Sequence, residues 1–261
     1  MALGFRGEVA GFYRQYRRGY PPAVIDSLVE AFALTRDDVV VDLGCGTGQL
    51  AFPVADRVRA VIGIDPEPDM LSEARTGAGD RGNLSWMVGA DTDVPALGAL
   101  LGKESLAAVT IGQALHWMDH QRLFHDLLPL VRPGGGVAVV TNGTPLWLQD
   151  SGWSRALRRY LELWLDTEVS ATCGTDEESQ SRYAESLQAA GYEVGRAEFH
   201  YDDQLDLERI IGGVYSALPV DLLPPVEQRS YFAKQVSRAL TEHTPYRESV
   251  RVTILTGTRV S

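Results

Sequence analysis

The amino-acid sequence predicts an α/β protein with a doubly wound, mostly parallel sheet of seven strands and a helical cap. Three observations support this prediction. Short β-branched runs alternate with helical stretches over residues 21–142, a glycine-rich turn follows the first of these runs, and the alternation gives way to helices after Asn142. Strands that are separated by helical stretches form parallel βαβ units, which join into one sheet with helices on both faces.

The first half of the chain carries this alternation. Residues 21–33 begin with two prolines and have apolar residues at helical spacing, which predicts a helix. A glycine turn at 44–48 then separates a strand from the helix that follows it. The other expected elements are strands at 38–43, 60–65, 84–91, 106–113 and 136–142, and helices at 48–57, 68–75 and 120–131.

The second half is mostly helical and ends in an alternating apolar and polar segment, which is typical of an edge strand. We expect helices at 151–165, 178–192, 205–217 and 224–243, and strands at 192–201 and 248–260. These helices should form a cap at the carboxyl edge of the sheet. The chain then has three parts: a helical lid at 1–35, a core at 36–142, and a cap with the final strands at 143–261.

The composition is that of a globular protein, with 44% hydrophobic and 23% charged residues among 261. No stretch reaches the ~20 apolar residues of a membrane span, and the N-terminus lacks the apolar core of a secretory signal. Cys45 and Cys173 are the only cysteines, which excludes a disulfide framework and a CxxC metal site. We therefore expect a cytoplasmic monomer or homodimer with no metal and no membrane partner.

The chain is acidic, with a net charge of -11 and an isoelectric point near 4.9. Proteins that bind nucleic acid usually carry a basic patch. The one basic cluster here, Arg14, Arg17 and Arg18, lies in a short N-terminal segment. The charge therefore argues against a nucleic-acid partner and weakly favours a cationic small molecule.

The stretch VVVDLGCGTGQL, residues 39–50, has the layout of a nucleotide-binding site at the carboxyl end of a first strand. Glycines there let the backbone approach a ligand closely. The GxGxG spacing differs from the GxGxxG of dinucleotide sites, which argues against a nicotinamide-dependent oxidoreductase. Asp65 ends the next strand 21 residues after Gly44, where a carboxylate can accept hydrogen bonds from both ribose hydroxyls.

Five segments together resemble the class I S-adenosylmethionine-dependent methyltransferases. They are VVVDLGCGTGQL, VIGIDPEPDML, GAD at 89–91, GQALHWMD and LVRPGGGVAVV, in the family's order over roughly residues 36–141. The resemblance implies the Rossmann-like methyltransferase fold, S-adenosylmethionine as cofactor and S-adenosylhomocysteine as product. The cofactor-binding residues it implies are Asp42, Gly44, Gly46 and Gly48 beside the methionine part, Asp65 on the ribose, Pro66 and Met70 near the adenine, Asp91 on the adenine amino group, and Gln113 at the amino-acid end.

The N-terminal segment FYRQYRRGYP is similar to a Y-x-x-Y-R-x-x-Y-P segment that folds over the cofactor in some members of that family. The residues that match are Tyr13, Tyr16, Arg17 and Tyr20. The resemblance implies that Arg17 pairs with the methionine carboxylate and that the tyrosines exclude water from the sulfonium. The alternative is an amphipathic surface helix with ordinary tyrosine–arginine stacking.

The segment ALHWMD follows the fourth strand, at the edge of the sheet where ligands bind. We expect His116 and Trp117 to border the acceptor, with His116 as the base if the acceptor is an amine. The alternative is a hydrogen-bonded structural histidine and a core tryptophan. A carboxylate from the cap is the other candidate base. The cap residues we expect at the site are Asp150 as a catalytic residue, and Trp147, Asp166 and Glu168 as substrate-binding residues.

Residues 142–210 contain fourteen acids and six bases, which predicts an acidic cap unless the acids only form a solvated face. The Asn/Asp-Pro-Pro-Tyr motif of nucleic-acid amino-methylating enzymes is absent. The composition also resembles that of actinomycete secondary-metabolism enzymes. We expect N-methylation of an aminoglycoside or aminosugar natural product in antibiotic biosynthesis. The alternatives are O- or C-methylation of another secondary metabolite, an NAD-dependent oxidoreductase, and a cofactor-binding module or cyclase that has lost methyl transfer.

Overall fold

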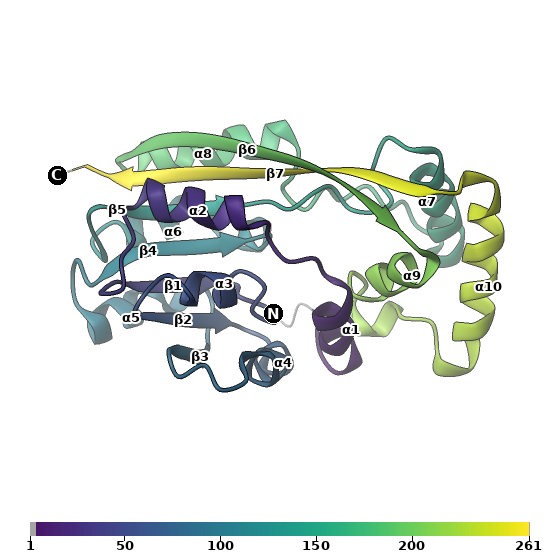
Figure 1. The fold of residues 1–261 in the computed structure, drawn as a ribbon, viewed down its shortest axis with the longest axis horizontal. Helices are drawn as coiled ribbons and strands as arrows, with labels where there is room; N and C mark the ends of the chain where they lie inside the picture. The colour runs from purple at the N-terminus through teal and green to yellow at the C-terminus, as the bar shows by residue number, and fades with distance from the viewer. Residues whose placement is uncertain (1–3, 261) are drawn as a thin grey trace.

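A computed structural model of the protein describes residues 4–260. They form one seven-stranded sheet with the strand order β3-β2-β1-β4-β5-β7-β6. The first five strands are parallel, and β7 runs antiparallel to both of its neighbours. The predicted doubly wound, mostly parallel sheet is therefore confirmed. In Figure 1, β6 and β7 run as a long ribbon from the sheet into the helices at the other end of the molecule.

The strands follow the β-branched runs of the sequence, with the largest differences in the last three. In β5 the pairing with β4 begins before the three glycines, and β6 and β7 are 14 residues long each. The strands are β1 (Val39–Leu43), β2 (Ala60–Asp65), β3 (Leu84–Val88), β4 (Leu106–Gly112), β5 (Val131–Val140), β6 (Tyr192–Leu205) and β7 (Tyr246–Arg259).

The last strand is not at the edge of the sheet, contrary to our expectation. β7 lies between β5 and β6, and β6 is the edge strand. Val252, Ile254 and Leu255 of β7 are buried, whereas β6 alternates exposed and half-buried residues over most of its length. A strand that pairs with a neighbour on each side can begin with the same alternation of apolar and polar residues as an edge strand. The sequence pattern therefore did not distinguish the two positions.

Helices cover both faces of the sheet. α5, α6 and α8 pack on one face, around Phe124, and α2 and α3 pack on the other, around Phe32. α5 was not expected from the sequence. The helices are α1 (Glu8–Tyr16), α2 (Pro22–Ala31), α3 (Ala51–Ala55), α4 (Pro68–Ala78), α5 (Val94–Leu101), α6 (His120–Leu127), α7 (Gly152–Leu165), α8 (Glu177–Ala189), α9 (Leu207–Tyr215) and α10 (Arg229–Leu240).

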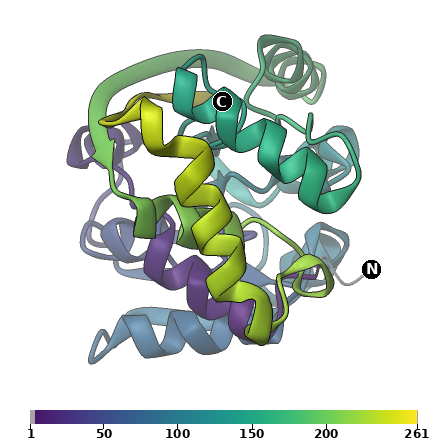
Figure 2. The same cartoon turned by 90° about the vertical axis from the view of Figure 1, so that its right-hand side faces the viewer.

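A separate helical cap stands at the carboxyl edge of the sheet. α7 and α10 cross at this end of the molecule (Figure 2). With α9 they share a core that includes Trp153, Leu157 and Phe232. α1 contacts α9 of this cap and α4 of the sheet layer, so it bridges the two (Figure 1). The first three residues of the expected lid, 1–3, lie outside the described residues. Within residues 4–260, none of the helices has the length and apolar character needed to cross a membrane.

Candidate active site

The glycine loop after β1 is held against β2. The backbone N–H groups of Gly44 and Cys45 donate to the carbonyl of Ile64 at 2.8 and 3.0 Å. Gly44 has a φ of +70°, and a Cβ added there would lie 2.4 Å from the Cβ of Ala114. Both features require glycine at this position. Gly46 and Gly48 also have positive φ, so the loop presents its backbone, with few side chains, to the carboxyl edge of the sheet.

Asp65 closes the loop from the end of β2. Its carboxylate accepts hydrogen bonds from the backbone N–H of Gly46 and of Glu67, each at 2.9 Å. Burial raises the pKa of Asp65, and these two hydrogen bonds oppose the rise. The carboxylate therefore lies beside the glycine loop, where the sequence placed the ribose.

Asp42 is a buried carboxylate near the end of β1. Its Oδ1 accepts a hydrogen bond from the Thr110 hydroxyl at 2.8 Å, whereas Oδ2 has no partner of good geometry among the described residues. Burial raises the pKa of Asp42 to about 7, although the hydroxyl of Thr110 and the nearby N–H of Ala51 offset part of the rise. A buried acceptor of this kind is costly unless a ligand completes its hydrogen bonds.

Gln113 follows β4 directly and has a φ of +55°. Its side-chain N–H group donates to the carbonyl of Gly143 at 3.4 Å, which fixes the amide. The side-chain oxygen is buried and has no partner among the described residues. β1 and β4 are adjacent parallel strands, so Gln113 and Asp42 follow the same edge of the sheet.

The N-terminal segment covers this edge. The Tyr13 ring lies against Gly46, within 3.6 Å of the position that a Cβ would occupy. The Arg17 guanidinium lies 4.9 Å from the centre of the Tyr13 ring, and its Nε is buried without a partner among the described residues. The Tyr20 hydroxyl lies 2.7 Å from the Cβ position of Gly112. Tyr13, Arg17 and Tyr20 therefore lie over this edge of the sheet, and their role as a lid stays a prediction.

Three buried polar atoms without partners thus belong to one region of the molecule: Asp42 Oδ2, Gln113 Oε1 and Arg17 Nε. Two are hydrogen-bond acceptors and one is a cationic donor. An amino-acid group, with its ammonium and its carboxylate, has the complementary set of donors and acceptors. The residues present therefore fit the methionine part of S-adenosylmethionine.

Four other residues expected at the cofactor have different surroundings. Tyr16 faces the cap, where its hydroxyl donates to Glu208 at 3.2 Å and its ring covers Gly212 of α9. Met70 is a buried core residue of α4, and Pro66 is exposed. Asp91 accepts a hydrogen bond from the N–H of Asp119 at 3.2 Å. Tyr16 is thus a residue of the lid–cap contact, since its ring turns to α9.

His116 and Trp117 lie in a 3-10 helix, Leu115–Trp117, that follows β4. Their ring centres are 4.8 Å apart. Burial, and then the charge of Arg17, lower the pKa of His116 to about 4, so the imidazole is neutral at physiological pH. Trp117 is half exposed, which argues against a role as a core residue.

A cavity of about 470 Å³ opens beside this pair. It lies between the segment after β4, the loop at 171–174 and α8, and none of its lining residues is acidic. The methyl group of Met118, another lining residue, lies 3.1 Å from the Cβ position of Gly44, so the cavity borders the glycine loop. The aromatic, thiol and basic side chains that line the cavity are His116, Trp117, His120, Cys173, Arg182 and Tyr183.

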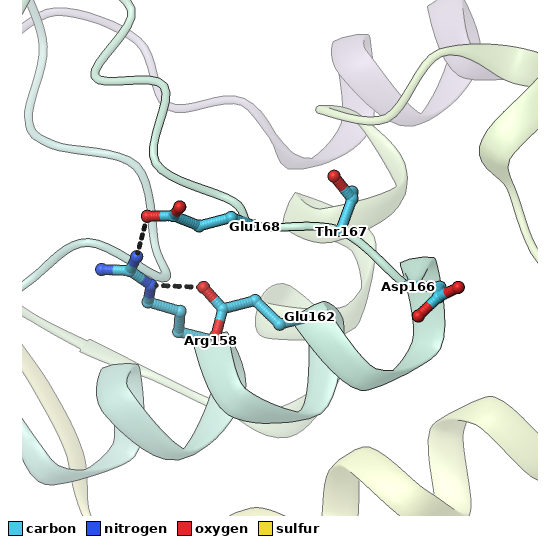
Figure 3. Close-up of a pocket in the computed structure, with 5 residues that line it drawn as sticks. All are labelled: Arg158, Glu162, Asp166, Thr167 and Glu168. Carbon is cyan, nitrogen blue, oxygen red and sulfur yellow. Dashed lines mark hydrogen bonds and ion pairs between the residues drawn. The ribbon is translucent and has the colours of Figure 1, made fainter.

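The cap residues that we expected at the acceptor do not line the cavity beside His116. The Asp150 side chain is fully exposed and pairs with Arg155 at 2.6 Å. Glu168 pairs with Arg158 at 3.2 Å, in a separate surface pocket whose lining includes Asp166 (Figure 3). In Figure 3 the Asp166 carboxylate points away from that pair. Asp150, Asp166 and Glu168 are surface residues of the cap, because charged side chains on its outer face gain hydration that a packed interior would remove.

Trp147 packs half-buried against the cap core and does not line the cavity. The residues that the sequence did not single out come from the other side of the cavity. Cys173, Arg182 and Tyr183 belong to the loop before α8 and to α8 itself, more than 50 residues after His116 in the chain. No motif marks them; the positive φ of Cys173, +54°, is visible only in the structure. No group of side chains suited to a metal ion occurs among residues 4–260.

Comparison with known proteins identifies the core. Residues 40–135 match the methyltransferase domain family. An uncharacterized methyltransferase of Mycobacterium tuberculosis is 35% identical over 157 residues, which are 60% of this chain and 58% of that protein. The chain thus spans less than two thirds of the length of such relatives.

Solved structures share the fold. A putative type II methyltransferase from Anaeromyxobacter dehalogenans aligns with a TM-score of 0.60 at 22% identity, covering 94% of this chain and 98% of that one. The [4+2]-cyclase SpnF aligns with a TM-score of 0.52 at 17% identity, covering 92% and 82%. The fold is therefore Rossmann-like, of the kind found in methyltransferases, and residues 40–135 match a methyltransferase domain, in agreement with S-adenosylmethionine as the cofactor.

Proposed function

We propose that this protein transfers a methyl group from S-adenosylmethionine to a small-molecule acceptor. The observation that carries the proposal is the set of three buried atoms without partners, Asp42 Oδ2, Gln113 Oε1 and Arg17 Nε, beside a side-chain-poor glycine loop. Their donors and acceptors match an amino-acid group, and a nicotinamide dinucleotide has no such group. The GxGxG spacing supports the same choice.

The cofactor would supply a methyl carbon already activated by its sulfonium, so the main tasks of the protein are to bind, to orient and to exclude water. Asp65 would hold the ribose, while Asp42, Gln113 and Arg17 would hold the amino-acid end. Tyr13 and Tyr20 lie over this edge of the sheet and would keep water out. The neutral His116 ring would receive a hydrogen bond, and then the proton, from an acceptor in the adjoining cavity.

The cavity suits an acceptor that carries no positive charge. Its one formally charged lining residue is Arg182, and the charge of Arg17 also acts on His116 and Cys173. A hydroxyl or carboxyl group that is methylated on oxygen fits these surroundings better than a polycationic aminosugar does.

N-methylation of an aminosugar in antibiotic biosynthesis therefore loses its main support, because the cap acids that suggested it form ion pairs on the surface. For an oxygen acceptor, His116 would accept the proton of the hydroxyl group, while S-adenosylmethionine held by Asp42, Gln113 and Arg17 would supply the methyl group and leave as S-adenosylhomocysteine. Both cysteines are free, which supports the proposal of a reducing, cytoplasmic setting.

The first experiment separates this function from the oxidoreductase alternative. Thermal unfolding should shift upward with S-adenosylhomocysteine and not with NAD, because only a specific ligand of the folded state stabilises it. The second experiment offers phenols, carboxylic acids and aminosugars with S-adenosylmethionine and measures release of S-adenosylhomocysteine. Binding without product from any acceptor class would favour the binding module or cyclase, and turnover of aminosugars alone would reject the oxygen acceptor.

A further inference from the structure

The three clustered arginines of the N-terminal segment have three separate partners. Arg14 pairs with Glu73 of α4 at 2.7 Å, and Arg17 lies over the Tyr13 ring. Arg18 turns the other way and pairs with Glu248 of β7 at 2.6 Å. The proposed chemistry uses Arg17 only, so the role of the Arg18–Glu248 pair requires its own explanation.

The Arg18–Glu248 pair is buried and well satisfied on its acidic side. The Glu248 side chain has no exposed surface, and that of Arg18 is 21% exposed. One carboxylate oxygen receives the Arg18 guanidinium, and the other receives the side-chain N–H of Gln149 at 2.7 Å. Both carboxylate oxygens therefore have donors, which offsets the cost of burying Glu248, whereas Nη1 of Arg18 has no partner among the described residues.

The pair holds a segment that has no regular structure of its own. Residues 17–20 lie between α1 and α2 and are neither helix nor strand. Besides the ion pair, the carbonyl of Gly19 accepts a hydrogen bond from the Asn142 side chain at 3.0 Å. The same segment carries Arg17 and Tyr20 to the cofactor edge, so its tertiary contacts decide where those two side chains stand.

The anchoring residues also connect to the opposite wall of the site. Asn142 follows β5, and the carbonyl of the next residue, Gly143, accepts the hydrogen bond of Gln113. The N–H of Gly143 donates to Arg251 of β7 at 3.0 Å, three residues from Glu248. The strand β7 thus supports both the lid segment and the residue that orients Gln113.

We propose that Arg18 and Glu248 are positioning residues, whose buried ion pair fixes residues 17–20 over the cofactor edge and thereby sets the affinity for the cofactor. This inference rests on the proposed function, since it assumes that Arg17 and Tyr20 cover S-adenosylmethionine. Neither Arg18 nor Glu248 is assigned a contact with the cofactor or with the reacting atoms. Their effect is transmitted through the lid segment.

The test uses Glu248→Gln in the full chain, which removes the charge and keeps the shape. Glu104→Gln is the matched control, because it breaks an Arg–Glu pair of 2.8 Å at the far end of the same strand, Arg259–Glu104. We measure the Kd of S-adenosylhomocysteine by calorimetry, and the rate of tryptic cleavage after the arginines of residues 14–18 without ligand. Glu248→Gln should raise Kd at least fivefold and speed cleavage at least threefold, whereas Glu104→Gln should change neither by more than twofold.

Folding defects are controlled by a second pair of variants. Arg18→Lys keeps the charge and should retain most of the affinity, whereas Arg18→Gln should behave like Glu248→Gln. A purely structural role would lower the thermal stability but leave Kd and lid cleavage of the folded protein unchanged, and that result would overturn the inference. Failure of the wild-type protein to bind S-adenosylhomocysteine would instead reject the proposed function, and the cleavage rates would still test the anchor.

Discussion

The ring of Tyr13 lies on the backbone of Gly46, with its Cε1 atom 3.6 Å from the position of an absent Cβ. The contact joins the N-terminal helix to the glycine loop of the first βαβ unit, 33 positions later in the chain. Because this segment rests directly on the loop, it should affect the binding of any ligand at the loop. We test this by removing residues 1–20.

We expect the truncated protein to keep its sheet and to lose its turnover. The two apolar clusters that flank the strands contain one residue of this segment, the half-buried Tyr20, so the sheet has little to lose, whereas the cap core loses Val9. Circular dichroism should retain the strand signal, while methyl transfer should fall at least a hundredfold, as when positioning and water exclusion are lost. Full activity in the truncated protein would show that the segment is only a surface helix.

Asp65→Ala should weaken cofactor binding by about 1–3 kcal/mol, the range for losing charged hydrogen bonds. The variant also leaves the N–H groups of Gly46 and Glu67 without their acceptor. Asp80→Ala, at an exposed position after α4, is the control. If calorimetry finds that folded Asp65→Ala binds S-adenosylmethionine with the wild-type affinity, Asp65 does not contact the cofactor.

Gly44→Ala should destabilise the fold by about 1–3 kcal/mol. The new methyl group would lie 2.4 Å from the Cβ of Ala114, and alanine would have to adopt a φ of +70°. Gly82→Ala, where the added Cβ meets nothing within 4 Å, should change the free energy of unfolding by less than about 0.5 kcal/mol. Urea unfolding measures both, and equal midpoints would contradict the strained geometry.

Acid should destabilise the protein through His116. Its pKa is 6.5 in the unfolded chain and about 4 when folded. Below pH 6.5 the unfolded state takes up a proton that the folded state does not. The free energy of unfolding should therefore fall as the pH falls from 6.5 to about 4, and His116 should cause no loss of stability above 6.5. His116→Gln should remove up to about 3 kcal/mol of this pH dependence. Parallel stability curves for the two proteins over this range would contradict the lowered pKa.

Cofactor affinity should also weaken as the pH falls, through Asp42. Its pKa is about 7 in the free protein, so an ammonium group that binds beside it must first displace a proton at lower pH. The Kd of S-adenosylmethionine should therefore rise as the pH falls below 7, by at most about tenfold per pH unit. In Asp42→Asn the affinity should be weaker and nearly independent of pH over the same range. A wild-type Kd that is constant from pH 5 to 7 would exclude this role.

Much of the sheet and of the cofactor edge was predictable from the sequence, because both depend on local patterns. A β-branched run, a glycine turn and an acidic strand end are contiguous features, and parallel strands bring their carboxyl ends to one edge. Asp42 and Asp65 lie near the carboxyl ends of β1 and β2, and Gly44 and Gln113 directly follow β1 and β4. The family resemblance of the N-terminal segment singled out Tyr13, Arg17 and Tyr20, which lie over the same edge of the sheet; their role at the cofactor stays a prediction.

What the sequence determined by itself was thus the order of the elements and the position of the glycine loop. Tertiary structure alone decided which side chains line the cavity beside His116. The acids Asp150, Asp166 and Glu168 stand on the outside of the cap, whereas Arg182 and Tyr183 of α8 line the cavity beside His116. Composition gives the number of charged residues but not where their side chains point. That orientation depends on how each helix packs against elements far away in the chain. The same holds for Arg18 and Glu248, which are 230 residues apart and become neighbours only when β7 inserts between β5 and β6.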